Sequence, residues 1–226
     1  KKQKIEFLNI FFVYFTKYNK LHYSDIGISY KYKKSIDEKK AFSKNISRLK
    51  LIEKTIPNIF EKNKSILDVG CGKGENIKYL IDKFNFSLIT GIDINTKAIE
   101  IIKKNTSSNK LKLINHDISD LNFLSKLNDN KYDYVLISHV LSTIFNDTLE
   151  KTLSIRKEII NHLFNITKIK LIIIDHPHMF NKNFSFEIEQ NTRGLFWNDL
   201  LKEVKKISTN YTLVKKENSN YLILNK

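Results

Sequence analysis

Cysteine is almost missing from this chain of 226 residues, and the single one present, Cys71, cannot form an internal disulfide. One cysteine is typical of a reducing compartment, and its place between two glycines favours a small loop residue over a nucleophile. Long apolar runs are missing as well. The best candidate, Ile5 to Phe15, contains Glu6 and Asn9, is too short to span a bilayer, and is followed by no small-residue cleavage site. We therefore expect a cytoplasmic protein without a membrane partner.

Arginine is scarce even though the chain is strongly basic. The formal net charge is +15, yet only Arg48, Arg156 and Arg193 are arginines. The charge is +10 over residues 1–65 (16 basic against 6 acidic), −1 over 66–150 (10 against 11) and +6 over 151–226 (13 against 7). Basic flanks suit an anionic partner such as RNA, a nucleotide or a phosphorylated sugar. Arginine grips phosphate better than lysine does, so a lysine surplus favours a compositional origin, as in an AT-rich genome, over a nucleic-acid site.

Three of the six glycines lie at every second position at the end of an apolar run over residues 66–74. Glycine lets the backbone turn sharply, so a buried strand running into Gly70, Gly72 and Gly74 should bring a cofactor to the start of the next helix. A dinucleotide-binding loop has the spacing G-x-G-x-x-G around a pyrophosphate, whereas here the third glycine comes one residue early. Asp68 also lies inside this turn, where a carboxylate would repel a phosphate and suit an ammonium group.

Apolar runs of strand length alternate with segments of helical period from Ser65 onward, which is typical of an α/β fold with a parallel sheet. The predicted strands are Ser65–Gly70, Ser87–Ile94, Lys110–Asp117, Tyr132–Val140 and Lys170–Asp175. The predicted helices are Gly74 to about Phe84, Thr96–Asn105, one starting near Asn146 or Asp147, and one near Leu195–Lys206. The chain then predicts a β-hairpin of Thr209–Lys216 and Tyr221–Asn225. A purely parallel NAD-binding fold does not usually end this way.

Residues 1–64 are predicted to be a helical extension ahead of a domain at 65–226. Two sets of positions support helices there: Phe7, Ile10, Phe11, Tyr14 and Tyr18 recur at helical spacing, and a capping box of Ser35 and Glu38 precedes Phe42, Ile46, Leu49 and Ile56. Packing of these helices onto the domain explains the aromatic residues of the first set. Between the two sets lies a segment rich in aromatic and hydroxyl side chains, residues 22–30.

The glycine run with Asp68, together with the terminal hairpin, resembles the class I S-adenosylmethionine-dependent methyltransferases. Their cofactor carries an amino acid and a sulfonium instead of a pyrophosphate. The resemblance covers residues 65–226 and implies a Rossmann-like seven-stranded sheet with helices on both faces, in which an antiparallel seventh strand lies between the fifth and sixth. Segments before the first strand often fold over the cofactor as a lid in this family, which makes Tyr23 and Tyr30 candidate contacts of the acceptor.

The cofactor site is expected at the carboxyl ends of the strands, where open α/β sheets bind ligands. The resemblance implies that S-adenosylmethionine lies there, with its methionine portion on the glycine loop and its ammonium group on Asp68, directly or through water. Asp93, 23 residues after Gly70, would take both ribose hydroxyls, and Asp117 would accept the adenine amine. The remaining expected cofactor contacts are Cys71, Gly72, Gly74, Ile94, Ile118 and Ser138. An acid that ends a strand can instead form a turn or cap, but three at matched strand ends favour a site.

The acceptor site should hold a base, because methyl transfer needs alignment and removal of a proton from an oxygen or nitrogen. Histidine titrates near neutrality, and His139, His176 and His178 all fall at the carboxyl edge. We favour His176 or His178 as the base, since a histidine near His139 only borders the cofactor in many relatives. The resemblance also places Arg193 and Trp197 in an insertion that usually shapes the acceptor pocket. Arg193 would grip an anionic acceptor, or else be a surface residue.

Two further enzyme classes are disfavoured by particular residues. The Asn/Asp-Pro-Pro-aromatic signature of amino-methylating DNA and RNA enzymes is missing after the fourth strand, where Ser138 to Leu141 stands instead. Asp175 with His176 and His178 resembles a divalent-metal cluster, but no Asp-Asn pair follows, and we expect no metal. The sequence thus predicts a methyltransferase acting on the oxygen of a small anionic acceptor. The alternatives are an RNA or protein methyltransferase that docks through its basic flanks, and a non-catalytic, cofactor-binding subunit.

Overall fold

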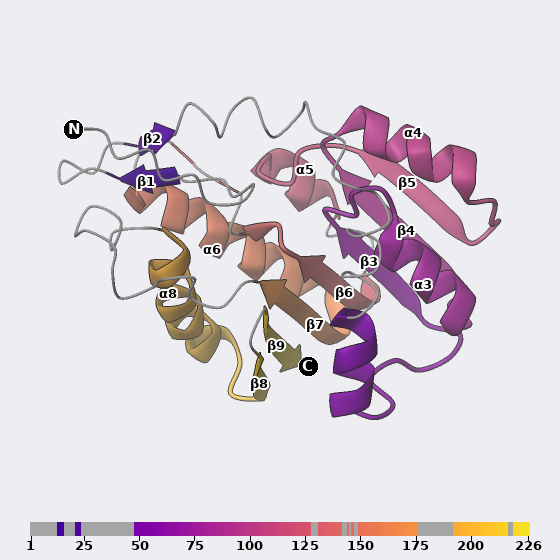
Figure 1. Cartoon of the computed structure of the whole chain (residues 1–226). Helices are drawn as coiled ribbons and strands as arrows, with labels where there is room; N and C mark the ends of the chain where they lie inside the picture. Colours follow the sequence, from indigo (N-terminus) through magenta and orange to yellow (C-terminus); the bar gives the residue numbers. More distant parts are fainter. Residues whose placement is uncertain are drawn as a thin grey trace.

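The computed structural model describes residues 13–15, 21–23, 48–127, 131–141, 144, 146, 149–175, 192–216 and 219–226. A large β-sheet with helices on both faces dominates this part of the chain (Figure 1). Its strands are β3 (Ser65–Val69), β4 (Leu88–Asp93), β5 (Leu111–Asn115), β6 (Tyr132–Ser138), β7 (Thr167–Asp175), β8 (Tyr211–Lys216) and β9 (Ser219–Asn225). The helices are α3 (Glu75–Lys83), α4 (Thr96–Asn105), α5 (Leu121–Lys126), α6 (Leu149–Ile166) and α8 (Thr192–Ile207). Residues 48–55 form a further helix ahead of β3.

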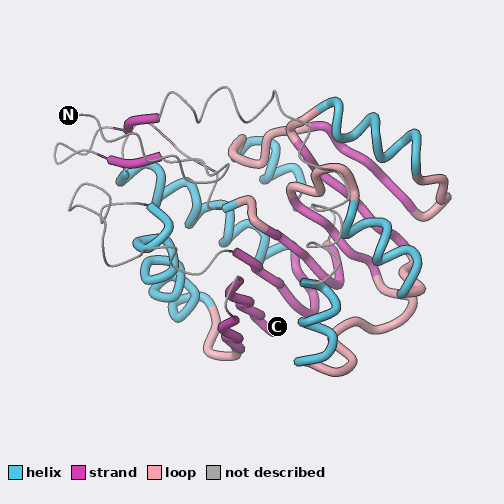
Figure 2. Tube along the Cα trace, in the orientation of Figure 1, coloured by secondary structure: helices cyan, strands magenta, loops and turns pink. Residues whose placement is uncertain are grey.

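The strands of the sheet lie in the order β5-β4-β3-β6-β7-β9-β8. Neighbours from β5 to β7 are parallel, whereas β9 is antiparallel to both β7 and β8. The predicted seven-stranded sheet, with an antiparallel last strand inserted beside the fifth parallel one, is therefore confirmed. The chain moves from β3 outward to β4 and later crosses back to β6 on the other side of β3 (Figure 2). The topological switch point, where such sheets bind ligands, thus lies between β3 and β6.

Strand β3 shows how the sheet is buried on both faces. Leu67 and Val69 belong to a core formed with α5, α6 and α8, whereas Ile66 belongs to a second core formed with α3, α4 and residues 48–55. Successive side chains of a strand point to opposite faces, so a continuous apolar run fits a strand that is covered on both sides. Helices α3 and α4 accordingly lie on one side of the sheet and α6 and α8 on the other (Figure 1).

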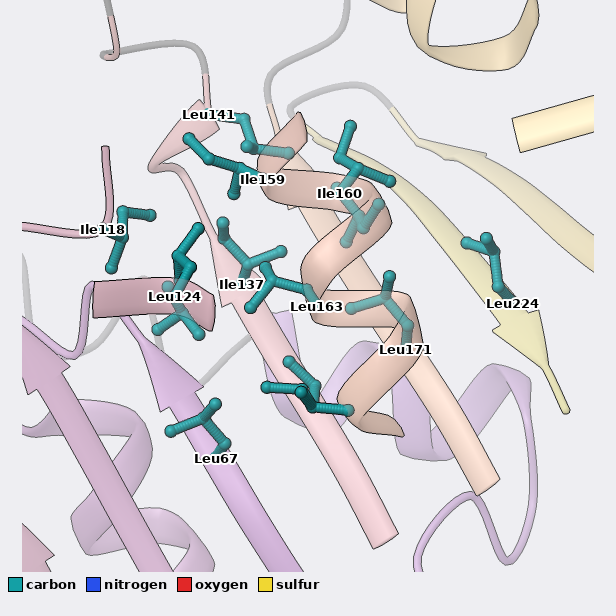
Figure 3. Packing of buried hydrophobic residues seen from close by; sticks show 14 of the residues in the cluster. Leu67, Ile118, Leu124, Ile137, Leu141, Ile159, Ile160, Leu163, Leu171 and Leu224 are labelled. Carbon is teal, nitrogen blue, oxygen red and sulfur yellow. The ribbon is translucent and has the colours of Figure 1, made fainter. Parts of the chain in front are cut away.

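Helix α6 packs on β6, which flanks the switch point, and on the neighbouring strand β7. Its residues Ile159 and Leu163 are four apart and share one face of the helix, and both are fully buried against Ile137 of β6 and Leu171 of β7 (Figure 3). Ile160 of the same helix is also buried. This packing holds α6 against β6 and β7.

Phe60 fixes the connection between residues 48–55 and β3. Its ring makes edge-to-face contacts with Phe84, Phe86 and Tyr134, with centroids 5.1, 5.6 and 5.3 Å apart. The hydroxyl of Tyr134 also accepts the backbone N–H of Glu61 at 3.0 Å. Edge-to-face geometry places the positive edge of one ring over the negative face of another, which stabilises the cluster beyond its buried area. The segment before β3 is thereby bound to the sheet.

The prediction of a helix from Phe7 to Tyr18 is wrong at residues 13–15. Val13–Phe15 form strand β1, which pairs antiparallel with β2 (Leu21–Tyr23), and β1 lies beside α8. A β-branched residue flanked by aromatics favours a strand, and the antiparallel partner eight residues on outweighs the helical spacing. The second predicted helix is confirmed for residues 48–55, where Leu49 is buried. The capping box lies outside the described residues, and the lid and the boundary at residue 65 stay predictions.

Other differences are local. Helix α5 was not predicted, although Asp120 caps it by accepting the N–H groups of Asn122 and Phe123. Strand β6 ends at Ser138 rather than Val140, because His139 has φ = 57° and leaves the extended conformation. Strand β7 begins at Thr167, three residues before the predicted start. Among the described residues, no helix has the length and apolarity needed to cross a membrane.

Candidate active site

The glycine loop between β3 and α3 has a left-handed backbone at each of its glycines. Gly70, Gly72 and Gly74 have φ values of 68°, 55° and 86°. The N–H groups of Gly70 and Cys71 both donate to the carbonyl of Ile92 on β4, at 2.8 and 3.0 Å. A Cβ at Gly70 would overlap Cγ2 of Val140, which follows β6. Only glycine combines this conformation with so close an approach of two strand ends, and the predicted tight turn is therefore present.

Asp93, the last residue of β4, ties two loops together. Its Oδ2 accepts the N–H of Gly72 at 2.8 Å, and its Oδ1 accepts the N–H of Asn95 at 2.8 Å. Each carboxylate oxygen has a second lone pair, so the group can still accept two hydroxyls. Its backbone carbonyl accepts Nδ2 of Asn115 at 2.8 Å. Asn115, which sequence reasoning missed, thereby joins the ends of β4 and β5.

Asp68 lies on β3 just before the loop and is fully buried. Its Oδ1 accepts Nδ2 of Asn76 at a long 3.4 Å, and its Oδ2 has no hydrogen-bond partner among the described residues. Burial raises the pKa of this carboxyl from 3.8 to about 7, and the neighbouring Glu75 and Asp93 add to the shift while Asn76 opposes it. A buried acceptor with an unused oxygen is costly unless a ligand pairs with it, and a cationic group is the natural partner.

The third predicted acid, Asp117, lies two residues beyond the end of β5. Its Oδ1 accepts both the N–H and the hydroxyl of Ser119, each at 2.8 Å, which closes a tight turn. The two isoleucines expected beside the adenine differ in their surroundings. Ile94 is exposed, whereas Ile118 is buried in the core beside α6 (Figure 3). A hydrogen bond therefore links Gly72 to Asp93, while Asp68 lies on the strand that leads into the same loop and Asp117 follows the neighbouring strand β5.

His139 and Asp175 lie together at the ends of β6 and β7. The two strands pair with Ser138 opposite Ile174, and the N–H of His139 donates to the carbonyl of Ile174 at 2.7 Å. Nδ1 of His139 is 3.8 Å from Oδ1 of Asp175. The side chains are 15% and 1% exposed. A histidine base candidate is therefore held next to a buried carboxylate at the carboxyl edge.

Arg48, in the helix of residues 48–55, interacts electrostatically with Asp175. Burial lowers the pKa of the Arg48 guanidinium, and the neighbouring Tyr221 and Asp175 oppose that shift. Arg48 was not among the predicted site residues, and Asp175 was considered only as a metal ligand. The interaction joins distant parts of the chain, and no local sequence pattern could have revealed it.

Of the other predicted acceptor-site residues, Tyr23 is in β2, and Arg193 and Trp197 are in the first half of α8. Tyr30, His176 and His178 lie outside the described residues. Within the described ranges, no group of three or more His, Cys, Asp or Glu side chains could hold a metal ion. His176 and His178, which would complete the cluster with Asp175, are not among these residues. The expectation that the protein binds no metal therefore stays a prediction.

The fold and the glycine loop with its acids define a class I, Rossmann-like methyltransferase. Residues 60–220 match a family model described as a methyltransferase domain, and the chain belongs to this family, whose methyl donor is S-adenosylmethionine. The predicted family and cofactor are thereby confirmed.

Two individual relatives match smaller parts of the chain than the family model does. Ribosomal RNA small subunit methyltransferase A of Mesomycoplasma hyopneumoniae is 30% identical over 115 residues, which are 50% of this chain and 44% of that protein. Malonyl-(acyl-carrier protein) O-methyltransferase of Priestia megaterium is 32% identical over 96 residues, 42% of this chain and 33% of that protein. The chain thus matches less than half the length of these relatives. The crystal structure of the plantazolicin methyltransferase BpumL with SAH shares the fold, with a TM-score of 0.58 and 17% identity over 84% of this chain and 87% of that one.

Proposed function

We propose that this chain transfers the methyl group of S-adenosylmethionine to an oxygen of a small anionic acceptor. The observation that carries the donor half is the buried Asp68 carboxylate, which has an unused oxygen at the mouth of the glycine loop. An ammonium group placed there would pair with that oxygen and ionise the carboxyl. A pyrophosphate at the same place would meet a carboxylate instead of donors.

The other donor contacts follow from the order of the strand ends. Gly70, Gly72 and the backbone at Cys71 would approach the methionine portion, Asp93 would accept the ribose hydroxyls, and Asp117 would accept the adenine amine. Ile94, Ile118, Gly74 and Ser138 would border the cofactor. A cofactor held in this way would lie at the switch point between β3 and β6, beside the ends of β6 and β7.

The proposal for the acceptor rests on side chains near the carboxyl ends of β6 and β7. An oxygen nucleophile must lose its proton while it attacks, and His139, His176 and His178 are the candidate bases. The basic flanks would raise the local concentration of an anion, and Tyr23, Tyr30, Arg193 and Trp197 are the proposed acceptor contacts. The malonyl-(acyl-carrier protein) relative, an O-methyltransferase by name, supports oxygen as the acceptor atom.

The donor assignment is tested by calorimetry with S-adenosylmethionine. Asp93→Ala should weaken binding by about tenfold or more, because two ribose hydroxyls lose their acceptor. Glu100→Ala, an exposed acid on the outer side of α4, is the matched control and should bind as the parent does. Unchanged tight binding by Asp93→Ala, in a variant whose circular dichroism is intact, would remove the ribose assignment.

The acceptor is tested by incubation of the protein with a metabolite extract and methyl-labelled cofactor. The expected result is a labelled, anionic small molecule in which mass spectrometry places the methyl on oxygen. Label on nitrogen, or in a macromolecule, would contradict the proposal. Cofactor binding without any labelled product would instead favour the non-catalytic subunit.

RNA methylation is the second candidate, favoured by the ribosomal RNA methyltransferase of M. hyopneumoniae among the relatives and by the net charge of +15. Salt titration of binding to a generic RNA separates the two functions. Docking on phosphates weakens steeply and linearly in a plot of log affinity against log salt, with a slope of about −0.7 for each neutralised phosphate of a single strand. A small-molecule enzyme should bind RNA weakly at physiological salt, so tight binding there would favour the RNA function.

A further inference from the structure

The register of β6 and β7 places His139 and Asp175 side by side. Ser138 is opposite Ile174, so the next residue of each strand is His139 and Asp175 respectively. His139 has φ = 57°, a left-handed conformation that is uncommon for a residue with a side chain and that recurs at functional sites. Its N–H still donates to the carbonyl of Ile174 at 2.7 Å. The backbone is thus bent at the point where the imidazole meets the end of β7.

Asp175 is almost fully buried between β6 and β9. It is the last residue of β7, is 1% exposed and pairs in register with Asn220 of β9, which is also buried. A buried carboxylate needs positive charge or donors close by. The charged and titratable groups that the structure records around it are His139 from β6, Arg48 from residues 48–55, and Tyr221 from β9 through its interaction with Arg48. Among these, Arg48 carries a permanent positive charge.

We infer that Asp175 is a positioning residue for His139: it holds the imidazole with Nδ1 toward its own carboxylate and stabilises the protonated ring. The inference rests on the proposed function and selects His139 among its three candidate bases. Asp175 does not touch the acceptor in this role.

The step is balanced without a further reactant. The acceptor oxygen forms a bond to the methyl carbon while the bond from that carbon to sulfur breaks, and the bonding pair stays on sulfur as the sulfonium becomes a thioether. The hydroxyl proton passes to Nε2 of His139, because Nδ1 faces Asp175. The positive charge thus moves from sulfur to imidazolium, next to the negative carboxylate, and the proton later leaves to water.

The test is a titration of His139 by nuclear magnetic resonance in the full chain, which needs neither cofactor nor acceptor. His139→Asn assigns the signal among six histidines, because asparagine tolerates a left-handed backbone. Asp175→Asn should lower the pKa of His139 by about one unit or more, since an opposite charge at this range favours the protonated ring. Thr212→Val, at an exposed position of β8, is the control and should leave it unchanged.

An unchanged His139 pKa in Asp175→Asn would overturn the inference. Should that variant fail to fold, Asp175→Ser, which also removes the charge, decides in its place: an unchanged His139 pKa contradicts the arrangement. The outcome is separable from that of the proposed function. Loss of the cofactor assignment would appear in calorimetry, whereas loss of this inference would appear as normal cofactor binding with a His139 pKa that does not respond to Asp175.

Discussion

Asp68 should make both the stability of the protein and its affinity for the cofactor depend on pH. The pKa of its carboxyl is about 7 in the folded protein and would return to about 3.8 on unfolding. Between these values the folded chain holds a proton that the unfolded chain releases. The free energy of unfolding without cofactor should therefore fall as pH rises from about 4 to 7, by at most ~1.4 kcal/mol per pH unit.

Binding of an ammonium group should reverse this preference, because the ionised carboxyl gains a partner. Cofactor affinity should then rise between about pH 5.5 and 7, with release of a proton that calorimetry detects by comparing buffers of different ionisation enthalpy. Asp68→Asn, which keeps the shape and removes the charge, should abolish both the proton release and the pH slope of stability. Equal proton release by parent and variant would show that Asp68 does not hold the ammonium.

Single residues differ in how far the sequence could reveal them. Gly70, Gly72 and Asp93 were predicted because their roles depend on a short spacing, and the structure shows the loop and the hydrogen bond from Gly72 to Asp93. Arg48 and Asp175 could not be found in this way. Their interaction arises only once residues 48–55 pack against the sheet, and a single sequence contains no signal for that contact.

Helices and strands could be predicted from the sequence where burial in the core requires a regular pattern of apolar residues. The continuous apolar runs of β3, β6 and β7 identified strands buried on both faces. The first 64 residues show the opposite case, since the aromatics around Val13–Phe15 suit either period and were assigned to a helix. Strand ends were less predictable than strands: His139 leaves β6 through a left-handed conformation that its residue type does not require.

The start of α6 shows how one helix fixes the loop that follows β6. The Thr152 hydroxyl accepts the N–H of Asn146 at 2.8 Å and donates to its carbonyl at 3.3 Å. One turn later, Arg156 donates from Nε and Nη2 to the carbonyl of Ile144, at 3.0 and 2.8 Å. Both side chains are buried. The helix therefore fastens the connection that leaves His139 for α6.

Removal of the Thr152 hydroxyl should loosen this connection. Thr152→Val keeps the shape and leaves the N–H of Asn146 without its acceptor, so the free energy of unfolding should drop by about 1–3 kcal/mol in urea titrations. Thr212→Val, at an exposed position of β8, is the matched control and should change it by no more than about 0.5 kcal/mol. A Thr152→Val loss as small as that of the control would mean that the loop does not depend on the hydroxyl.

At the scale of the whole molecule, β9 joins the two cores. Leu222 and Leu224 belong to the core beside α6 and α8, while Tyr221 and Ile223 belong to the core beside α3 and residues 48–55. All four are buried, and the strand lies between β7 and β8. Neither face of the sheet is therefore complete without the last strand of the chain.

The described part of the chain should consequently unfold as one cooperative unit, and two substitutions on opposite faces of β9 test this. Leu222→Ala and Ile223→Ala should each lower the free energy of unfolding by about 2–5 kcal/mol, because each leaves a cavity in a different core. Circular dichroism and calorimetry should still report one coincident transition in both variants, since losing either core removes the strand that the other needs. Lys215→Ala, exposed on β8, should shift the midpoint little. Two separate transitions in Leu222→Ala, one of them at the parent's midpoint, would show that the core beside α3 folds independently, and β9 would then be an addition to a sheet that is stable without it.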